Sequence, residues 1–283
     1  MESLKKQLVS VGGTSRSGST LLARILSNNP SSKNLGEISA LFHPWRVHHF
    51  EFIRELKATN SLWRTILLKP KNGYPEAVFS EFRDSCFIDS SKNVHWIHKA
   101  ASKASKLNIN QKNVLIFKNP TDFAYSILKR GNQDWVQQYV SYHRKYFALI
   151  PASYFVYYRD FIMDKSVLQQ LYGWLKLNYN ERVIDYKSSD DIGFFGSQTP
   201  KKHLKLKYDS FIPPEFLNKI MSDIDNNPEV EEIWNYLYHN RNKYTTIDRS
   251  LGYSRMKMIY YCFRYMARIK FRSRFPEKYI PHT

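Results

Sequence analysis

A turn near the start of the chain carries the glycines and hydroxyls of a phosphate-binding loop. In the stretch VSVGGTSRSGSTLLARIL, four residues separate Gly13 from Gly18, and Ser19 and Thr20 follow. This is the spacing of G-x-x-x-x-G-K-[ST], except that a serine replaces the lysine and Arg16 supplies a cation inside the turn. A strand before the turn and a helix after it would aim backbone N–H groups and the positive end of a helix dipole at one point. We therefore predict an anion site here, against the alternative that the glycines serve only a tight turn.

The missing lysine decides which phosphate chemistry the loop can serve. A P-loop kinase or ATPase uses that lysine to reach the β- and γ-phosphates and holds Mg²⁺ on the hydroxyl that follows. Ser19 cannot make this contact. Sulfuryl transfer places less charge on the reacting group, and arginine or lysine side chains near the leaving phosphate suffice without a metal. We favour sulfuryl transfer, and Asp89, as a possible Mg²⁺-binding aspartate after a strand, keeps a nucleotide kinase as the alternative.

Three separate segments resemble the sulfotransferases that use 3′-phosphoadenosine 5′-phosphosulfate (PAPS). TSRSGSTLL at 14–22 resembles their 5′-phosphosulfate loop. FIDSSK at 87–92 resembles the strand end of the carbohydrate-type and bacterial members. The segment LIFKNPTDFAYSILKRG at 115–131 resembles the segment of these enzymes that binds the 3′-phosphate. Lys118 stands where the family usually has arginine, so a point charge takes the place of a bidentate group, and Ser126 follows eight positions later.

The resemblance implies a set of contacts to PAPS as co-substrate. Lys118 and Ser126 would bind the 3′-phosphate, and Lys92 would stabilise charge on the leaving phosphate beside Arg16. We expect no metal ion at the site. The expected contacts to the phosphosulfate come from Ser15, Arg16, Ser17, Gly18, Ser19 and Thr20.

Glu37 is the candidate general base for the acceptor hydroxyl. A helix over 19–28 leads about 15 Å away from the loop, and an extended return over 31–37 covers about 20 Å, enough to bring the carboxylate back. The LGEIS segment also resembles the Gly-Glu of tyrosylprotein and some bacterial sugar sulfotransferases, in which the glutamate is the base. A surface glutamate in a turn is the alternative. Cytosolic aryl sulfotransferases use a histidine after the second strand, but the nearest imidazole here, His95, is expected inside a helix.

The other histidines do not predict a metal site. His43, His48 and His49 lie close together in the sequence, and His95 and His98 are three apart. No cysteine or carboxylate completes a zinc pattern with them, so we expect them to be solvated or to face the acceptor.

Short apolar runs alternate with helical patterns along the chain. Runs at 8–11, 86–88, 114–117 and 154–158 are rich in β-branched or aromatic residues and predict strands. Asn119 with Pro120 predicts the start of a helix that ends near Gly131, and Pro213-Pro214 and Pro228 predict two more helix starts. The pattern predicts an α/β, P-loop-like, three-layer domain with a central parallel sheet, helices on both faces and a helical cap insertion. We expect one domain over 1–283, with the cap at about 38–85.

Composition and charge narrow the partners. Lys and Arg number 43 against 25 Asp and Glu, so the net charge of +18 predicts anionic partners. Cys86 and Cys262 are the only cysteines, which indicates a reducing compartment and two buried thiols. We find no secretory signal pattern, and the longest apolar stretch, at 256–269, is broken by charges. A cytoplasmic protein is expected.

The basic, aromatic C-terminal segment 251–283 contains eight Lys and Arg and one acidic residue. It fits peripheral contact with the inner membrane surface or, less well, a nucleic acid, and such a basic binding module is a third hypothesis for the whole chain. We favour an ordinary docked helix that buries Met256, Ile259, Phe263 and Met266.

The acceptor is expected to be a hydroxyl on a saccharide or glycan, and an anionic one suits the basic composition. A tyrosine-containing peptide or a small phenol is the alternative. The cluster of Lys201, Lys202 and His203 is either a loop that closes over the co-substrate or a solvated run of charge, and the latter is favoured.

Overall fold

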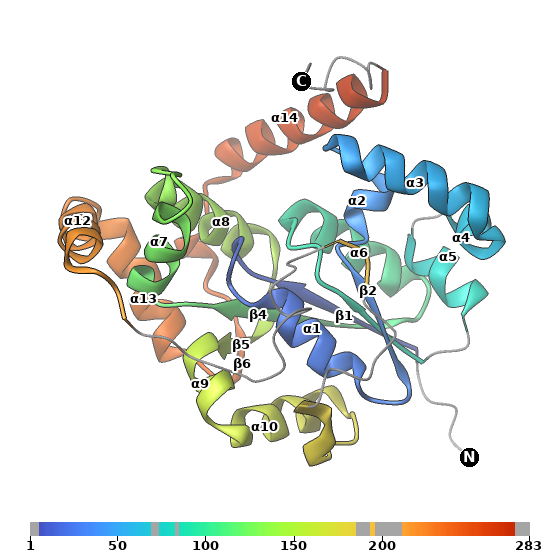
Figure 1. Cartoon of the computed structure of the whole chain (residues 1–283), viewed down its shortest axis with the longest axis horizontal. Helices are drawn as coiled ribbons and strands as arrows, with labels where there is room; N and C mark the ends of the chain where they lie inside the picture. The colour runs from blue at the N-terminus through green and yellow to red at the C-terminus, as the bar shows by residue number, and fades with distance from the viewer. Residues whose placement is uncertain (1–5, 69–73, 83–84, 185–192, 196–210, 275–283) are drawn as a thin grey trace.

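A twisted, mainly parallel sheet forms the centre of the molecule (Figure 1). The computed structural model describes residues 6–68, 74–82, 85–184, 193–195 and 211–274, and of 268–274 only the backbone. Within these residues the strand order is β2-β3-β1-β4-β5-β6, with β6 antiparallel to β5 and all other pairs parallel. The strands are β1 (Gln7–Gly12), β2 (Ser32–Gly36), β3 (Cys86–Asp89), β4 (Asn110–Phe117), β5 (Ala152–Tyr157) and β6 (Tyr244–Thr246).

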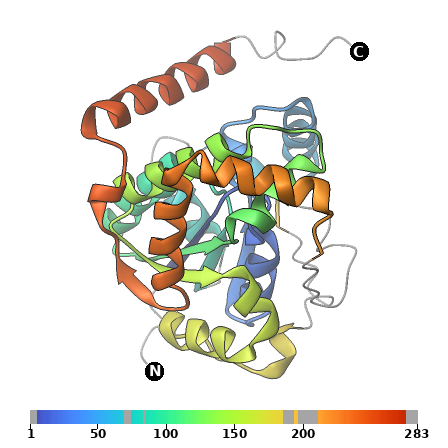
Figure 2. The same ribbon diagram turned by 90° about the vertical axis from the view of Figure 1, so that its left-hand side faces the viewer.

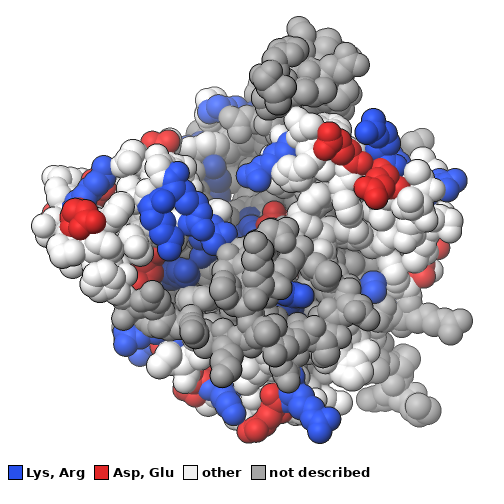
Figure 3. Space-filling view, in the orientation of Figure 1, with Lys and Arg blue, Asp and Glu red and all other residues white. Residues whose placement is uncertain are grey.

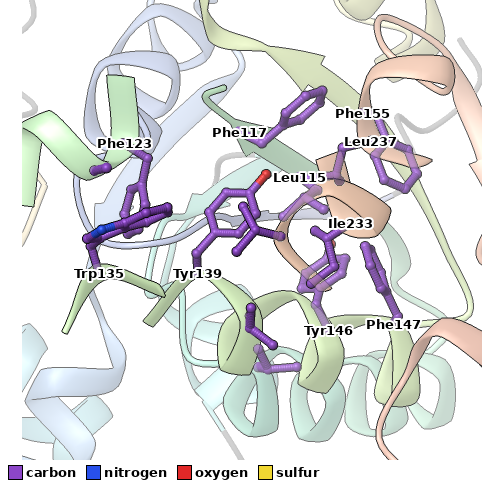
Figure 4. Close-up of a cluster of buried hydrophobic side chains, with 14 of the residues drawn as sticks. Leu115, Phe117, Phe123, Trp135, Tyr139, Tyr146, Phe147, Phe155, Ile233 and Leu237 are labelled. Carbon is purple, nitrogen blue, oxygen red and sulfur yellow. The ribbon is translucent and has the colours of Figure 1, made fainter. Parts of the chain in front are cut away.

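Alternation along the central strands builds two cores, one on each face of the sheet. In β4, Val114 and Ile116 join the core on the side of helices α1 (Ser19–Ser27), α9 (Tyr158–Met163) and α10 (Lys165–Leu175). Leu115 and Phe117 join the core under α6 (Val94–Lys106), α7 (Pro120–Leu128), α8 (Trp135–Leu149) and α13 (Pro228–His239). Successive side chains of a strand point to opposite faces, so a continuous apolar run is what a strand buried on both faces requires. Figures 1 and 2 show the helices on both sides of the sheet, and Figure 4 shows the second core.

The predicted fold class is confirmed, including all four predicted strands. The other described elements outside the cap are η1 (Glu181–Ile184), α12 (Pro214–Asp225), η2 (Arg249–Leu251) and α14 (Arg255–Arg274).

The helix starts that the sequence marks with proline are confirmed. The Asn119 side chain accepts a hydrogen bond from the backbone N–H of Asp122 at 2.6 Å, with Pro120 in the first turn. This cap satisfies one of the free N–H groups of α7. The helices predicted at Pro214 and Pro228 also begin there.

The predicted cap is helical and lies between β2 and β3. Trp63 and Ile66 of the cap pack in one cluster with Leu8 of β1 and Phe87 of β3, so the cap shares a core with the sheet. Its helices are α2 (Ser39–Phe42), α3 (Val47–Thr59), α4 (Ser61–Leu68) and α5 (Tyr74–Glu81).

Helix α14 corrects one expectation about the C-terminal segment. The residues predicted to be buried face solvent: the exposed fractions are 77% for Met256, 55% for Ile259, 69% for Phe263 and 53% for Met266. The opposite face is the docked one, and its contacts include a stacked pair of the His95 and Tyr265 rings with centroids 5.0 Å apart. Both faces of this helix are apolar or aromatic, so periodicity alone could not choose between them.

The two cysteines differ in burial. Cys86 is buried as predicted, whereas Cys262 is only half-buried, against α6.

Among the described helices none is both long and apolar enough to cross a membrane.

Candidate functional site

The predicted site residues gather at one edge of the sheet, where the parallel strands end. The glycine-rich loop 13–18 follows β1, and Glu37 follows β2. Residues 90–92 follow β3, and Lys118 follows β4. Because these strands are neighbours and run in the same direction, their carboxyl ends lie side by side. This edge is where ligands bind in open α/β sheets.

The loop has room only for glycine at two positions. Gly13 has φ +149°, and a Cβ there would lie 2.5 Å from the carbonyl oxygen of Ile116 and would also clash with Oγ of Ser17. Gly18 has φ +103°, and a Cβ there would lie 2.5 Å from the ring of Tyr158. The backbone therefore turns tightly against β4 and α9 and leads directly into α1.

The start of α1 presents backbone N–H groups and hydroxyls. Gly18 is the N-cap and, within the described chain, no side chain caps the helix, so backbone N–H groups of the first turn lack intrahelical partners. Ser17 is fully buried, and its hydroxyl has no hydrogen-bond partner in the described part of the protein. Ser19 and Thr20 are also buried, whereas Ser15 is exposed. A buried hydroxyl without a partner in the described chain, beside a helix N-terminus, fits an anion site.

One backbone donor of the loop is already engaged. The N–H of Gly13 donates to the hydroxyl oxygen of Tyr142 at 2.6 Å. This contact to α8 positions the start of the loop. It joins residues far apart in the sequence, so no local pattern could predict it.

Four cations surround the end of β4. Burial lowers the pKa of Lys118 to about 8; Asp122 opposes this shift, while Arg16, Lys129 and Arg130 add to it. Burial, followed by the charge of Arg130, likewise lowers the pKa of Arg16. Figure 3 shows Lys and Arg side chains gathered on the side of the molecule that carries α7. Like charges held this close raise one another's energy, and an anion between them would relieve the repulsion.

Sequence reasoning did not assign Lys129 and Arg130 to this cluster. Arg130 is held at the end of α7 by a hydrogen bond from its guanidinium to the carbonyl oxygen of Ser126. The hydroxyl of Ser126 donates to the carbonyl oxygen of Phe123 at 2.7 Å, so it must rotate to donate to a phosphate. The adjacent Lys-Arg pair at the end of a capped helix was the available signal.

Glu37 and Lys92 form an ion pair between the ends of β2 and β3. Their side chains are only 15% and 19% exposed, so the pair is largely shielded from water. The N–H of Glu37 donates to the carbonyl oxygen of Phe194 at 2.6 Å, and the preceding Gly36 has φ +61°, where a Cβ would clash with that same oxygen. The structure thus brings together the predicted base and the predicted lysine.

Asp89 is closed to a metal ion. It accepts hydrogen bonds from the hydroxyl of Tyr74 at 2.5 Å, from Nε1 of Trp96 at 2.8 Å and from the N–H of Ser91 at 2.9 Å. Burial raises the pKa of Asp89 although these hydrogen bonds oppose the shift. Both carboxylate oxygens are therefore used to fix the end of β3 against the cap, which removes the aspartate of the kinase alternative.

Two further hydroxyls at this edge were not predicted. Ser39 and Ser90 are each 1% exposed, and within the described residues neither side-chain oxygen has a hydrogen-bond partner. The N–H of Ser90 donates to the carbonyl oxygen of Gly36 at 2.8 Å. This hydrogen bond joins the ends of β2 and β3.

Several histidines are held by contacts inside the fold. His95 is inside α6 as predicted, with Nδ1 3.5 Å from Sγ of Cys262 under α14, and burial lowers its pKa to about 4. Burial also lowers the pKa of His49 to about 4, and the pKa of His43, which packs edge-on against Trp96. In the residues that the structure describes, no three metal-ligating side chains converge. Lys201, Lys202 and His203 lie outside the described residues.

Comparison with solved structures gives distant likenesses. No protein-family model matches the sequence, and no curated protein matches it significantly. A sulfotransferase domain from the olefin synthase of Synechococcus PCC 7002 is 17% identical, with a TM-score of 0.48 over 78% of this chain and 95% of that one. A sulfotransferase domain from the curacin biosynthetic pathway is 13% identical, with a TM-score of 0.49 over 78% and 98%.

A structure from the PezAT toxin-antitoxin system of Streptococcus pneumoniae is 15% identical, with a TM-score of 0.32 over 84% of this chain and 89% of that one. At these TM-scores the likenesses do not indicate a function for this protein.

Proposed function

We propose that this protein is a sulfotransferase that moves the sulfuryl group of PAPS to an acceptor hydroxyl. The observation that carries the proposal is the shielded Glu37–Lys92 pair on the strand ends beside a phosphate loop whose cation is Arg16. A carboxylate next to an ammonium group, at a site built for an anion, suits proton removal from a hydroxyl combined with charge stabilisation.

The described residues fit the two phosphate ends of PAPS. The loop offers the unsatisfied hydroxyl of Ser17, the first-turn N–H groups of α1 and the cation of Arg16 for the 5′-phosphosulfate. Lys118 and Arg130 form a second cationic position for the 3′-phosphate, with Ser126 between them on α7. The loop and α7 therefore offer cations for both phosphates of the nucleotide.

When bound, PAPS supplies an electrophilic sulfur with a phosphate leaving group. Glu37 accepts the proton of the acceptor hydroxyl, and Lys92 donates to the oxygen on which charge develops. The ion pair holds both groups in place before the acceptor arrives, so that no side chain has to be recruited from elsewhere.

We infer a carbohydrate hydroxyl as the acceptor, reached from the cap side of Glu37. The half-buried rings of Phe42 and His43 near Trp96 offer flat surfaces of the kind on which sugar rings stack. The exposed Arg46 and His48 suit an anionic saccharide. Acceptor screening with labelled PAPS against sulfated or uronic-acid glycans, neutral glycans and phenols tests this assignment, and exclusive turnover of phenols would reverse it.

Calorimetry with nucleotides tests the proposed function directly. We expect 3′-phosphoadenosine 5′-phosphate to bind far more tightly than ATP, and its affinity to be unchanged by EDTA. The reason is that the site has a cationic 3′-phosphate position and no lysine at Ser19 to reach a γ-phosphate. Tighter, Mg²⁺-dependent binding of ATP would instead support the alternative, a nucleotide kinase.

A further inference from the structure

The outward face of α14 is apolar although it faces water. The exposed fractions of its large side chains are high: Met256 77%, Ile259 55%, Tyr260 54%, Phe263 69% and Met266 53%. Spacings of three and four residues place these positions on one side of the helix. Contiguous exposed apolar surface of this kind marks an interaction site in a folded protein.

The opposite face of α14 fixes how the helix lies. Met258 is buried, Sγ of Cys262 is 3.5 Å from Nδ1 of His95, and Tyr265 stacks on the same imidazole. Nζ of Lys145 on α8 lies 4.1 Å from the ring centroid of Tyr261. The helix is therefore docked on α6 and α8 through one face, and Figures 1 and 2 both show it on the outside of the molecule. The apolar outward face is a consequence of this docking.

The positive charge of α14 indicates which kind of partner binds its outward face. Its sequence, RMKMIYYCFRYMARIKFRSR, holds seven Lys and Arg and no acidic residue. Arg255, Lys257 and Arg264 are exposed beside the apolar residues. A second copy of this chain would bring two such helices together and repel. A nucleic acid would pair with the cations but would gain nothing from burying Met256 or Ile259.

We propose that α14 docks the protein on an anionic lipid surface, with its outward apolar side chains in the boundary between headgroups and acyl chains. Helices that lie in this boundary combine an apolar face, flanking Lys and Arg, and aromatic residues such as Tyr260 at the headgroup level. The cations add attraction to anionic headgroups. This inference does not depend on the proposed enzymatic activity.

Vesicle sedimentation with the full chain tests the proposal. We expect binding to vesicles of phosphatidylcholine mixed with phosphatidylglycerol, weaker binding at high salt, and little binding to phosphatidylcholine alone. The double variant Ile259→Ser/Phe263→Ser, at positions that face solvent, should lower the partition coefficient by about tenfold or more. The double variant Lys257→Gln/Arg264→Gln should lower it by roughly 25-fold, about five-fold for each cation.

The matched control is the double variant Leu68→Ser/Met163→Ser, which removes side chains that are 69% and 70% exposed on other helices. It should bind vesicles like the parent protein. The proposal is overturned by absent or salt-insensitive binding, or by an Ile259→Ser/Phe263→Ser variant that binds normally. It is also overturned if light scattering finds a dimer that this variant dissociates, because a second copy then covers the face.

Discussion

The backbone at Lys92 is unusual for a lysine. Its φ of +59° lies in the left-handed region, where a residue with a Cβ carries a penalty of roughly 1–2 kcal/mol. Arg16 of the phosphate loop also has a positive φ, +72°. Both side chains belong to the candidate site, and strained residues of this kind cluster at functional sites, where the position of the side chain outweighs the penalty.

Removing the carboxylate of Glu37 should damage turnover and spare nucleotide binding. Glu37→Gln keeps the size of the side chain but cannot accept a proton, so the rate of sulfuryl transfer should fall by about 10²–10⁴-fold. Affinity for 3′-phosphoadenosine 5′-phosphate should stay within a few-fold in calorimetry. Glu51→Gln, on the exposed face of α3, is the control and should turn over normally. Near-normal turnover of Glu37→Gln would eliminate this residue as the base.

The pKa of Lys118 predicts a pH dependence of nucleotide binding. In the free protein the group is half-charged at about pH 8, because burial lowers its pKa. A bound 3′-phosphate favours the charged form, so the pKa rises in the complex and binding takes up a proton above pH 8. Affinity for 3′-phosphoadenosine 5′-phosphate should be level below this pH and should fall above it, by up to about tenfold per pH unit.

Two controls isolate the 3′-phosphate contact in the same titration series. Adenosine 5′-phosphosulfate lacks this phosphate, so its affinity should not follow the pKa of Lys118. Lys118→Ala should bind the 3′-phosphorylated nucleotide more weakly, by about 1.5–3 kcal/mol, and should lose the pH dependence. An unchanged slope in this variant would assign the titration to another group.

At the scale of elements, the loop between β1 and α1 depends on the absence of a side chain at Gly13. Gly13→Ala forces a Cβ to within 2.5 Å of the Ile116 carbonyl oxygen at a positive φ. Strain and overpacking together should lower the free energy of unfolding by roughly 2–4 kcal/mol, measured by urea denaturation.

A glycine without such contacts provides the comparison for that loop variant. At Gly173, in α10, a Cβ would meet nothing within 4 Å. Gly173→Ala should therefore raise the free energy of unfolding, by about 0.5–1 kcal/mol. A stable Gly13→Ala protein with normal nucleotide affinity would mean that the loop adapts and that its close approach to β4 is not required.

At the scale of the whole molecule, the cap and the sheet share one core. Trp63 and Phe79 of the cap pack in the same cluster as Leu8 and Phe87 of the sheet. The buried carboxylate of Asp89 joins the same units by its hydrogen bonds to α5 and α6. Their stabilities are therefore coupled.

Thermal unfolding should accordingly occur in a single transition. Tryptophan fluorescence, which includes Trp63 and Trp96 beside the cap, should report the same midpoint as far-UV circular dichroism, and the calorimetric enthalpy should equal the van't Hoff enthalpy. A separate, earlier fluorescence transition would show that the cap unfolds on its own and would divide the chain into two units.

Features that depend on a local pattern of residues could be predicted from the amino-acid sequence. Continuous apolar runs such as 114–117 require burial on both faces and therefore predicted central parallel strands. Asn119 with Pro120 predicted a helix start, and the glycines after β1 predicted a tight turn from a strand into a helix, because these signals act over a few residues. Glu37 could be placed because the lengths of one helix and one extended return fix where the chain comes back.

Features that depend on neighbours distant in the sequence could not be predicted from it. β2 was not predicted as a strand because SKNLG lacks β-branched residues, and pairing with β3 supplies what its own sequence does not. From the sequence, Asp89 could have been a ligand of Mg²⁺, but in the structure its carboxylate accepts hydrogen bonds from Tyr74 and Trp96. Helix α14 has two apolar faces, and only its contacts with α6 and α8 determine which one remains in water, because periodicity gives the direction of a side chain and not its partner.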